Sequence, residues 1–418
     1  MKKFILALSV TTILSIPNMA LASDHASVID VVNINKSVGT VKGSAQRNAM
    51  HKMRRSFNFS SIGDEYTHFK EWMQKEYGLD FSLDISYMGQ RGAPSGKKNS
   101  MQTIYYPSIT WTAFDNDYGV GTFNFAYNAV RYGGTQASNL ANRIGVATPI
   151  NDYDTPSNAF DELYFSYQFG GNWDWLTVAV GQFPMYNFDG SAYNSNQQVN
   201  FINYALSQNA SSTYPTASLG MYTQISPNDE WSFTLGAQDA TNVSGESIKT
   251  NDLNEEHFAT FAGLTYSPTI PKLGDGQYSI LLYNQPGVDL QTETTNGWSI
   301  NLSQNIGEKL NVFARVNGVS GNVATINQSW VLGAVYNNPL DRNPLDQIGL
   351  AFAYNKIDEK AVGEELSHES EKIIEAYWAW GVSKWMTITP DIQFYIDPAE
   401  NDKSDYATVF TLRTTLFF

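Results

Sequence analysis

Side-chain amides and aromatic rings gather in one segment of the chain, residues 182–214, in which Asp189 is the only charged residue. An amide offers paired hydrogen-bond donors and acceptors that match the hydroxyl groups of a sugar. An aromatic face gives contact area to the apolar C–H face of a pyranose. The segment therefore suits neutral polyols better than ions, although such amides would also fill any exposed loop and such rings would also pin a loop to a wall. The candidate solute contacts in it are Tyr193, Asn194, Gln197 and Phe201.

The elements that must position this segment are β-strands. Between residues 79 and 88 apolar and polar side chains alternate, so that Phe81 and Leu83 share one face while Asp80 and Asp84 share the other. Segments of this kind, bounded by turn residues, recur to the end of the chain. Sixteen are expected, near residues 79–88, 102–113, 120–131, 160–169, 173–181, 215–225, 230–239, 258–267, 277–284, 297–306, 309–317, 327–337, 346–355, 372–381, 386–396 and 406–418.

The connections between these strands alternate in length. Those after even-numbered strands are mostly short, as at 115–119, 170–172, 226–229 and 307–308, and those after odd-numbered strands are longer, as at 132–159, 182–214, 240–257 and 356–371. A transmembrane barrel with both termini in the periplasm shows this alternation, whereas a soluble propeller with four blades of four strands has no reason to. Sixteen strands enclose a water-filled lumen. The third outer loop of sixteen-stranded porins usually folds into that lumen, and here it is the amide-rich segment.

The two ends of the chain predict export to the outer membrane of a Gram-negative cell. Lys2 and Lys3 precede an apolar run up to Ile16 and then a small-residue cleavage pattern, which together indicate a signal peptide over residues 1–22. The last predicted strand ends on a phenylalanine, Phe418. A terminal strand that ends on phenylalanine is what the assembly machinery of outer-membrane barrels recognises. The alternative for this strand is the last edge strand of a soluble β domain.

The composition narrows the class of protein. The formal charge of −15 means that the protein repels polyanions, so we expect no nucleic-acid partner. The absence of cysteine excludes a disulfide framework, a zinc–thiolate site and a cysteine nucleophile. After the signal no apolar run approaches the roughly 20 residues of a spanning helix, so any crossing of the lipid bilayer must use strands. The predicted fold is all-β, a transmembrane antiparallel β-barrel, and the 14% of aromatic residues suit its two girdles.

Several motifs resemble the carbohydrate-selective porin (OprB) family. The most diagnostic is the Thr-Pro-Asp-Ile-Gln element within residues 385–394, and residues 342–349 are similar to the family's Arg-x-x-Asp-x-Leu-Gly stretch. The resemblance covers most of the chain from about residue 160 to 418 and is weak over residues 23–75. It implies a monosaccharide-permeable channel, with sugars as the transported solutes, whose constriction carries both arginine and acidic side chains on the wall.

This sequence offers such residues on the lumen face of its strands. In the strand that begins at Leu310, Val312 and Ala314 face outward, so Arg315 faces inward. A one-residue error in register would reverse each assignment. The alternative role of inward ion pairs is to hold the barrel together. The wall residues assigned in this way are Arg315, Arg413, Glu375, Glu162, Asp391 and Gln393.

Two other classes of function stay open at this point. An outer-membrane phospholipase or protease needs a strand-borne base beside a nucleophile or a metal, and none of the five histidines lies within a predicted strand next to a serine. We therefore predict no catalytic residue, no metal site and no cofactor. A less selective porin, for another neutral or anionic metabolite or for an exported polysaccharide, is not distinguished by sequence. The sequence also does not distinguish a monomer from a homo-oligomer.

Two segments precede the first strand. Residues 61–77 carry Phe69, Trp72 and Tyr77 at roughly helical spacing, which predicts a short amphipathic helix. Residues 33–55 are basic and contain no acidic side chain, which indicates a flexible solvated extension, the alternative being an arm that docks on the periplasmic mouth or on cell-wall anions. The predicted organisation is a signal peptide (1–22), a periplasmic arm and helix (23–77) and an outer-membrane barrel (78–418).

Overall fold

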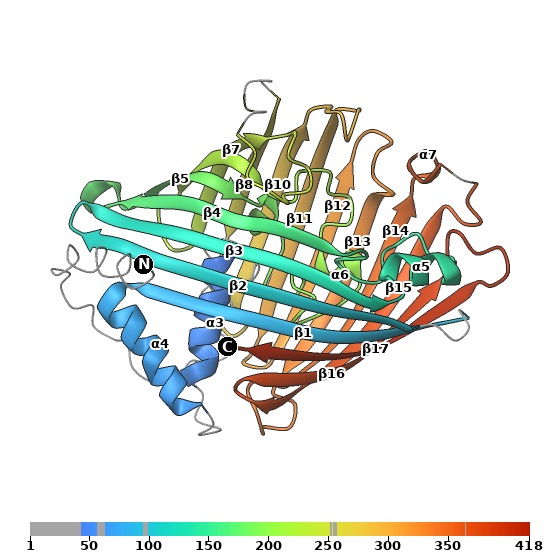
Figure 1. Cartoon of the computed structure of the whole chain (residues 1–418), viewed down its shortest axis with the longest axis horizontal. Coiled ribbons are helices and arrows are strands. Elements are labelled where there is room, and N and C mark those ends of the chain that lie inside the picture. The colour runs from blue at the N-terminus through green and yellow to red at the C-terminus, as the bar shows by residue number, and fades with distance from the viewer. Residues whose placement is uncertain (1–42, 57–62, 95–98, 251–252, 254–256, 364) are drawn as a thin grey trace, which may run out of the picture.

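The computed structural model describes residues 43–56, 63–94, 99–250, 253, 257–363 and 365–418. Within them one antiparallel sheet contains seventeen strands, of which β9 is a two-residue strand in the turn before β10. The other sixteen form a barrel that closes through the pairing of β1 with β17 (Figure 1). The strands are β1 (Leu79–Ala93), β2 (Asn99–Asn116), β3 (Gly119–Gly134), β4 (Ser157–Phe169), β5 (Leu176–Phe183), β6 (Ser218–Ile225), β7 (Trp231–Asp239), β8 (Phe258–Tyr266), β9 (Thr269–Ile270), β10 (Gly274–Gln285), β11 (Thr295–Ile306), β12 (Leu310–Val319), β13 (Ile326–Asn337), β14 (Gln347–Ile357), β15 (Ser370–Ser383), β16 (Met386–Ile396) and β17 (Tyr406–Phe417).

The barrel and its sixteen wall strands confirm the fold predicted from the sequence. Consecutive wall strands pair with each other, and the closing register runs from Asp84 opposite Phe417 to Ala93 opposite Thr408. The strand bounds agree within a few residues. β5 begins later than predicted because residues 171–173 form a short 3-10 helix, η2 (Gly171–Trp173), in the preceding turn.

The connections distinguish two ends of the barrel, which we call the turn end and the loop end. The turn end carries residues 117–118, 170–175, 226–230, 267–273, 307–309, 338–346 and 384–385, and the loop end carries residues 135–156, 184–217, 240–257, 286–294, 320–325, 358–369 and 397–405. The predicted alternation in length holds only in part, because the turns 267–273 and 338–346 are both longer than the loop 320–325. Residues 184–217, which we call the inner loop, form the longest connection.

Strand alternation sorts the side chains between the lumen and the outer surface. In β17, Val409 and Arg413 are buried, whereas Phe410 and Leu412 are about half exposed to the outside. Outward aromatic side chains gather near both ends of the barrel, as the two-girdle prediction requires. Stacked pairs at the turn end are Trp111 with Phe123 and Trp231 with Tyr266, and a stacked pair at the loop end is Phe394 with Tyr406.

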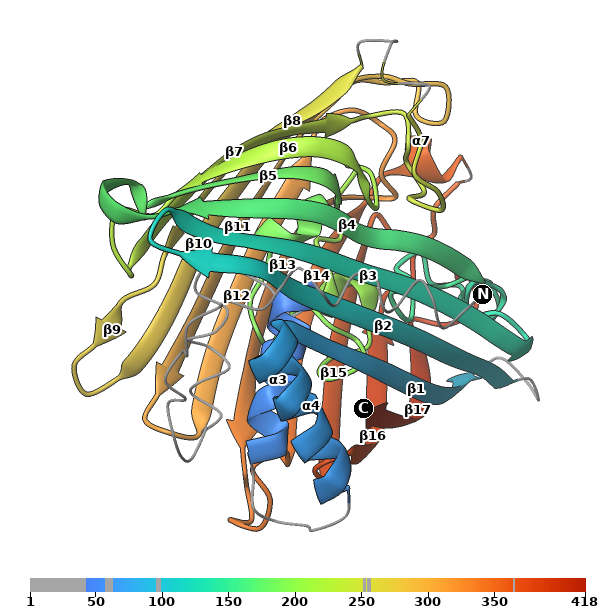
Figure 2. The ribbon, with the colours of Figure 1, turned by 60° about the vertical axis from the view of Figure 1, so that its left-hand side comes forward.

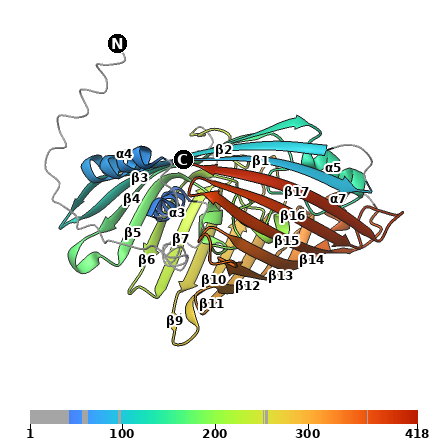
Figure 3. The same cartoon turned by 90° about the horizontal axis from the view of Figure 1, so that it is seen from below.

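Two helices precede the barrel. α3 (Ser44–Ser56) lies inside the ring of strands near the turn end, and α4 (Asp64–Tyr77) lies outside it (Figures 2 and 3). α4 confirms the predicted amphipathic helix. It packs on the outer face of β1 through the rings of Phe69 and Phe81, whose centroids are 6.2 Å apart. Among the described residues, no helix combines the length and apolarity of a membrane-spanning helix.

The prediction of a flexible solvated extension is wrong for residues 44–55. These residues belong to α3, and Arg47 and His51 are buried in the lumen. The physical reason is Asp84 on the inner face of β1, whose carboxylate accepts from Arg47 Nη1 at 2.7 Å and lies 2.5 Å from His51 Nε2. Residues 33–42 of the same segment and the predicted signal peptide, 1–22, lie outside the described residues.

Candidate functional site

The inner loop lies across the lumen. It leaves the wall after β5, and its helix α6 (Tyr204–Ser207) packs against β13 and β14, which are far from β5 in the order of strands (Figure 1). The loop also contains the 3-10 helix η3 (Met185–Phe188). α6 begins where it does because the side chain of Asn203 accepts a hydrogen bond from the backbone N–H of Ala205 at 3.1 Å, as an N-cap does.

Arg315, on β12, holds one part of this loop. Its Nε donates to Asn301 Oδ1 at 2.8 Å, and its two terminal nitrogens donate to the backbone carbonyl oxygens of Asn194 and Gln208. The side chain is almost completely buried. Arg315 therefore contacts the backbone of Asn194, and the side-chain oxygen of Asn194 accepts from the N–H of Ser191.

Arg413, on β17, holds the middle of the loop in the same way. Its Nη1 donates to the carbonyl oxygens of Gln197 and Asn200, and its Nη2 donates to that of Val199 at 3.2 Å. A planar guanidinium can serve several oxygens because its donors point in fixed, divergent directions. Three of the four carbonyl groups of residues 197–200 are satisfied in this way, and the fourth, that of Gln198, accepts from Thr415 Oγ1 at 2.8 Å.

Glu375, on β15, binds the complementary groups of the loop. Its two carboxylate oxygens accept from the backbone N–H groups of Ile202 and Asn203 at 2.5 and 2.9 Å. The side chain of Asn203 donates to Gln393 Oε1 on β16 at 3.1 Å. The positively charged arginines therefore bind the carbonyl oxygens of the loop, which carry partial negative charge. The negatively charged Glu375 binds backbone N–H groups, which carry partial positive charge.

Asp391, two residues before Gln393 on the same inner face, is also buried. Its carboxylate interacts with the side chains of Glu375 and Thr411 and with the charge of Arg413. Arg413 Nε and Asn194 Nδ2 are buried without a hydrogen-bond partner. Two of the predicted residues, Arg413 and Asn194, thus retain hydrogen-bonding capacity that the protein itself does not use.

Asp189, the one charge of the inner loop, is fully engaged. Its Oδ1 accepts from Ser299 and from Asn301 Nδ2, both at 2.7 Å, and its Oδ2 accepts from Asn209 Nδ2 at 2.9 Å. Asn301 also receives the hydrogen bond from Arg315 Nε, so it connects the two charges. The carboxylate is consequently not presented to the lumen as a free anion.

The predicted loop side chains have separate partners. Gln197 accepts from the backbone N–H of Asp152 at 2.8 Å and donates to Gln102 on β2 at 3.3 Å. The hydroxyl of Tyr193 accepts from Asn337 Nδ2 at 3.1 Å. The ring of Phe201 is fully buried, with centroid distances of 5.6 Å to Phe313 and 4.9 Å to Tyr377. In this arrangement Phe201 pins the loop to the wall.

Glu162 lies in a different part of the lumen from the two arginines. It accepts from the backbone N–H of Ser44 at 2.9 Å, at the start of α3, and from Asn187 Nδ2 at 2.6 Å. The neighbouring Asp161 is also buried and accepts from Asn128 at 2.7 Å. Strict alternation would have placed Asp161 outside; an irregular register between β3 and β4 turns both carboxylates inward.

The sequence did not predict the buried charged residues of α3 and α4. Burial lowers the pKa of His51, against the opposing effect of Asp84. Burial and the nearby Arg55 lower the pKa of Lys70, on α4, to about 7. A signal was present in the sequence, because Asp80 and Asp84 share the inward face of the first strand while residues 33–55 contain only basic charge.

A cavity of about 300 Å³ lies on the loop-end side of the inner loop. Asp152 and Asp154 line it together with Tyr204, Ser212 and Thr325. Cavities of about this volume and larger hold small organic ligands. Its lining combines acceptors, hydroxyl groups and one ring, which are the groups that bind polyols. Across the described residues there is no cluster of three or more His, Asp or Glu side chains suited to a metal ion.

Comparisons with known proteins agree with this architecture. A model of the carbohydrate-selective porin, OprB family, matches residues 118–418. Porin AaxA of Chlamydia abortus is 37% identical over 355 residues, which cover 85% of this chain and 76% of that protein. Porin AaxA of Chlamydia pneumoniae is 37% identical over 354 residues, which cover 82% and 80%. The high-pH structure of Pseudomonas putida OprB, at 16% identity, has a TM-score of 0.68 over 85% of this chain and 97% of that one. At this identity the last likeness concerns the fold alone.

Proposed function

Because this chain belongs to the carbohydrate-selective porin (OprB) family, we propose that it is an outer-membrane channel through which monosaccharide-sized sugars diffuse passively. A porin of this family is a channel rather than an enzyme. The preference for sugars is the part of the proposal that rests on the chemistry of this chain.

The observation that carries the proposal is the inner loop lying across the lumen. Its single carboxylate, Asp189, is saturated by hydrogen bonds, and its remaining side chains are uncharged. A neutral polyol exchanges its hydrogen bonds with water for bonds with amides at little cost, whereas an ion would lose hydration without a counter-charge. The loop therefore favours a neutral solute over a charged solute of the same size.

The wall residues have two roles in this proposal. Arg315, Arg413 and Glu375 set the position of the loop, and so the width of the aperture, through its backbone. Asn194 Nδ2 is a donor that no protein group occupies, and Asp391 is an acceptor beside Glu375 and Thr411. A sugar hydroxyl, which both donates and accepts, can form a hydrogen bond with either group.

We place the turn end in the periplasm, with both termini, and we keep residues 1–22 as the export signal. The exposed apolar band of the wall then faces the outer-membrane lipid. The last residue takes part in closing the barrel, since Phe418 and Leu83 exchange two backbone hydrogen bonds, of 2.9 and 3.0 Å. That pairing supports the last strand as the substrate of the assembly machinery.

Liposome swelling tests this function. We expect proteoliposomes to swell faster in glucose than in alanine or sodium gluconate of equal osmolarity, and more slowly in a trisaccharide. Liposomes without protein give the baseline for leakage. Equal rates for glucose and gluconate would remove the preference for sugars and leave a general porin, and the absence of swelling in every solute would remove the channel.

A further inference from the structure

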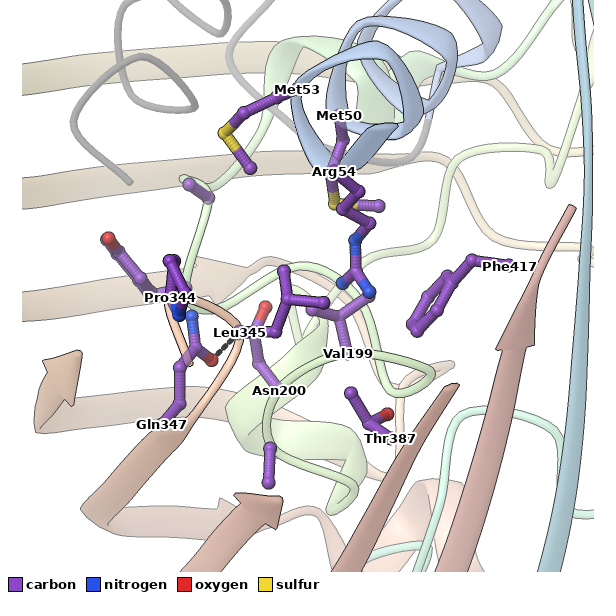
Figure 4. Close-up of a pocket in the computed structure, with 13 residues that line it drawn as sticks. Met50, Met53, Arg54, Val199, Asn200, Pro344, Leu345, Gln347, Thr387 and Phe417 are labelled. Carbon is purple, nitrogen blue, oxygen red and sulfur yellow. Dashed lines mark hydrogen bonds between the residues drawn. The ribbon is translucent and has the colours of Figure 1, made fainter. Parts of the chain in front are cut away.

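A second cavity, of about 40 Å³, lies between α3 and the inner loop (Figure 4). Arg54 points into it from α3, and Phe417 faces it from the last strand. Most of its wall is apolar, with side chains of Met50, Val199 and Leu345. The cavity is therefore a mainly apolar chamber that contains one cationic group.

Arg54 differs from the other arginines of α3 in its surroundings. Arg47 has the carboxylate of Asp84 at 2.7 Å, and Arg55 has that of Asp80 at 3.6 Å. The guanidinium of Arg54 lies over the ring of Phe417, 3.4 Å from its centroid, and its Nε and Nη1 are buried without an acceptor. Burial lowers the pKa of Arg54 to about 10, so the group stays cationic at neutral pH.

The carboxylate near Arg54, that of Asp84, is already paired with Arg47 and His51, so Arg54 is a buried cation without a carboxylate of its own, which is an unfavourable arrangement. The ring of Phe417 offsets part of the lost hydration through its π-electron face. Ordered water would satisfy the two N–H groups, and a cavity of this size has room for it, but water brings no negative charge. An anion in the cavity would satisfy both the hydrogen bonds and the charge.

Asn200 adds a second unused group to the same cavity. Its Nδ2 donates to Gln347 Oε1 at 3.1 Å, which leaves its Oδ1 as a buried acceptor without a donor. A carboxylate has no proton to offer to that oxygen at neutral pH, whereas a hydroxyl group does. The cavity thus offers a cationic donor and a neutral acceptor among apolar side chains.

We propose that this cavity binds a small hydroxycarboxylate, whose carboxylate accepts from Arg54 and whose hydroxyl donates to Asn200. The short carbon skeleton between the two groups packs against Met50, Val199 and Leu345. The cavity is too small for a sugar ring, so the ligand must be smaller than one. The site is separate from the sugar pathway proposed above and does not depend on it.

Ligand-observed NMR titration tests the site on the full-length protein folded in detergent micelles. The probes are sodium lactate, lactamide, which has the same skeleton without the charge, and propionate, which lacks the hydroxyl. We expect lactate to bind about tenfold more tightly than lactamide and a few-fold more tightly than propionate, the ratios that a charge-assisted and a neutral hydrogen bond give. Equal binding of lactate and lactamide would overturn the proposal.

Substitutions on the same helix supply matched controls. Arg54→Gln should weaken lactate binding about tenfold, whereas Arg55→Gln, which removes the same charge one residue away, should change it less than about twofold, because Arg55 does not line the cavity. An equal loss in both variants would mean a diffuse field instead of a site and would overturn the proposal. Hydrogen exchange over residues 44–56 shows whether α3 stays docked.

If Arg54→Gln detaches α3 from the lumen, a second variant, Arg54→Lys, tests the site instead. It keeps the charge, so it should retain most of the affinity for lactate over lactamide, and loss of that preference with α3 docked would count against the site. These titrations need no transport. Lactate binding with no swelling in glucose would refute the channel and keep the site, and the reverse result would do the opposite.

Discussion

Replacing Arg413 by Met should release the inner loop from the wall. The substitution keeps a long unbranched side chain but removes the donors that serve the carbonyl oxygens of Gln197, Val199 and Asn200. A hydrogen bond to a charged group contributes about 1.5 to 3 kcal/mol, but three bonds from one guanidinium do not add independently. Truncating one partner of a buried charged contact costs about 2 to 5 kcal/mol. We therefore expect the attached state of the loop to lose about 3 kcal/mol, which is roughly a hundredfold change in its population relative to the detached state.

Hydrogen exchange measured by mass spectrometry reports this change directly. In the attached loop the N–H of Asn200 donates to the carbonyl of Asn196 at 2.9 Å, and the N–H of Ile202 donates to Glu375. Peptides that cover residues 194–203 should exchange up to about a hundredfold faster in the variant. The strands β16 and β17 should keep their protection, because their ladder does not use the side chain of Arg413.

Arg131→Met is the matched control. Arg131 also donates to backbone carbonyl oxygens, those of Val130 and Ser157, but at an exposed position on the wall, so its removal should stay within about 0.5 kcal/mol. Unchanged exchange of residues 194–203 in Arg413→Met would refute the anchoring role. If that result came with weaker block of the single-channel current by sugar, Arg413 would contact the solute instead of holding the loop.

Three further changes have expected outcomes. Glu375→Gln leaves one side-chain oxygen for the two N–H groups of residues 202 and 203, so exchange there should rise by about tenfold, and equal exchange would contradict its role. Phe418→Asp should lower surface abundance of the protein, because the side chain at the closing pair becomes charged where strand β1 meets it; unchanged abundance would argue against the last strand as an assembly signal. Lys70 has a folded pKa of about 7 against an ordinary value of 10.5, so between about pH 7 and 10.5 the unfolded chain holds a proton that the folded chain lacks, and stability rises with pH over that window; Lys70→Met should flatten this rise in denaturant titrations at pH 7 and 9, and an unaltered slope would assign it to other groups.

The strands and their order of connection were accessible from the sequence because a barrel wall has two chemically different sides. Lipid outside and polar groups inside force an alternation with period 2, so the inward placement of Arg315, Arg413 and Glu375 follows from counting along each strand. All three are buried within the barrel. The counting fails in β4, where the ladder is irregular and both Asp161 and Glu162 turn inward.

The partners of these side chains were not accessible in the same way. Arg315 and Arg413 bind backbone carbonyl oxygens of the inner loop. Every residue has a carbonyl oxygen, so the pattern of side chains does not predict which of them an arginine binds. α3 has the same difficulty. The sequence predicts a solvated arm because its charges are all basic. The carboxylate that pairs with Arg47 is that of Asp84 on β1, which contacts α3 in the folded barrel.

Anchoring through the backbone separates two properties of the inner loop. Its position depends on Arg315, Arg413 and Glu375, which bind peptide groups, while in the proposed function its chemistry toward solutes depends on side chains such as those of Asn194 and Gln197. A change of an inner-loop amide alters what the aperture prefers without removing an anchor, because the peptide groups remain. A change of an anchor alters the width of the aperture for all solutes at once. The same sixteen-stranded wall can therefore support channels of different selectivity through substitutions within one loop.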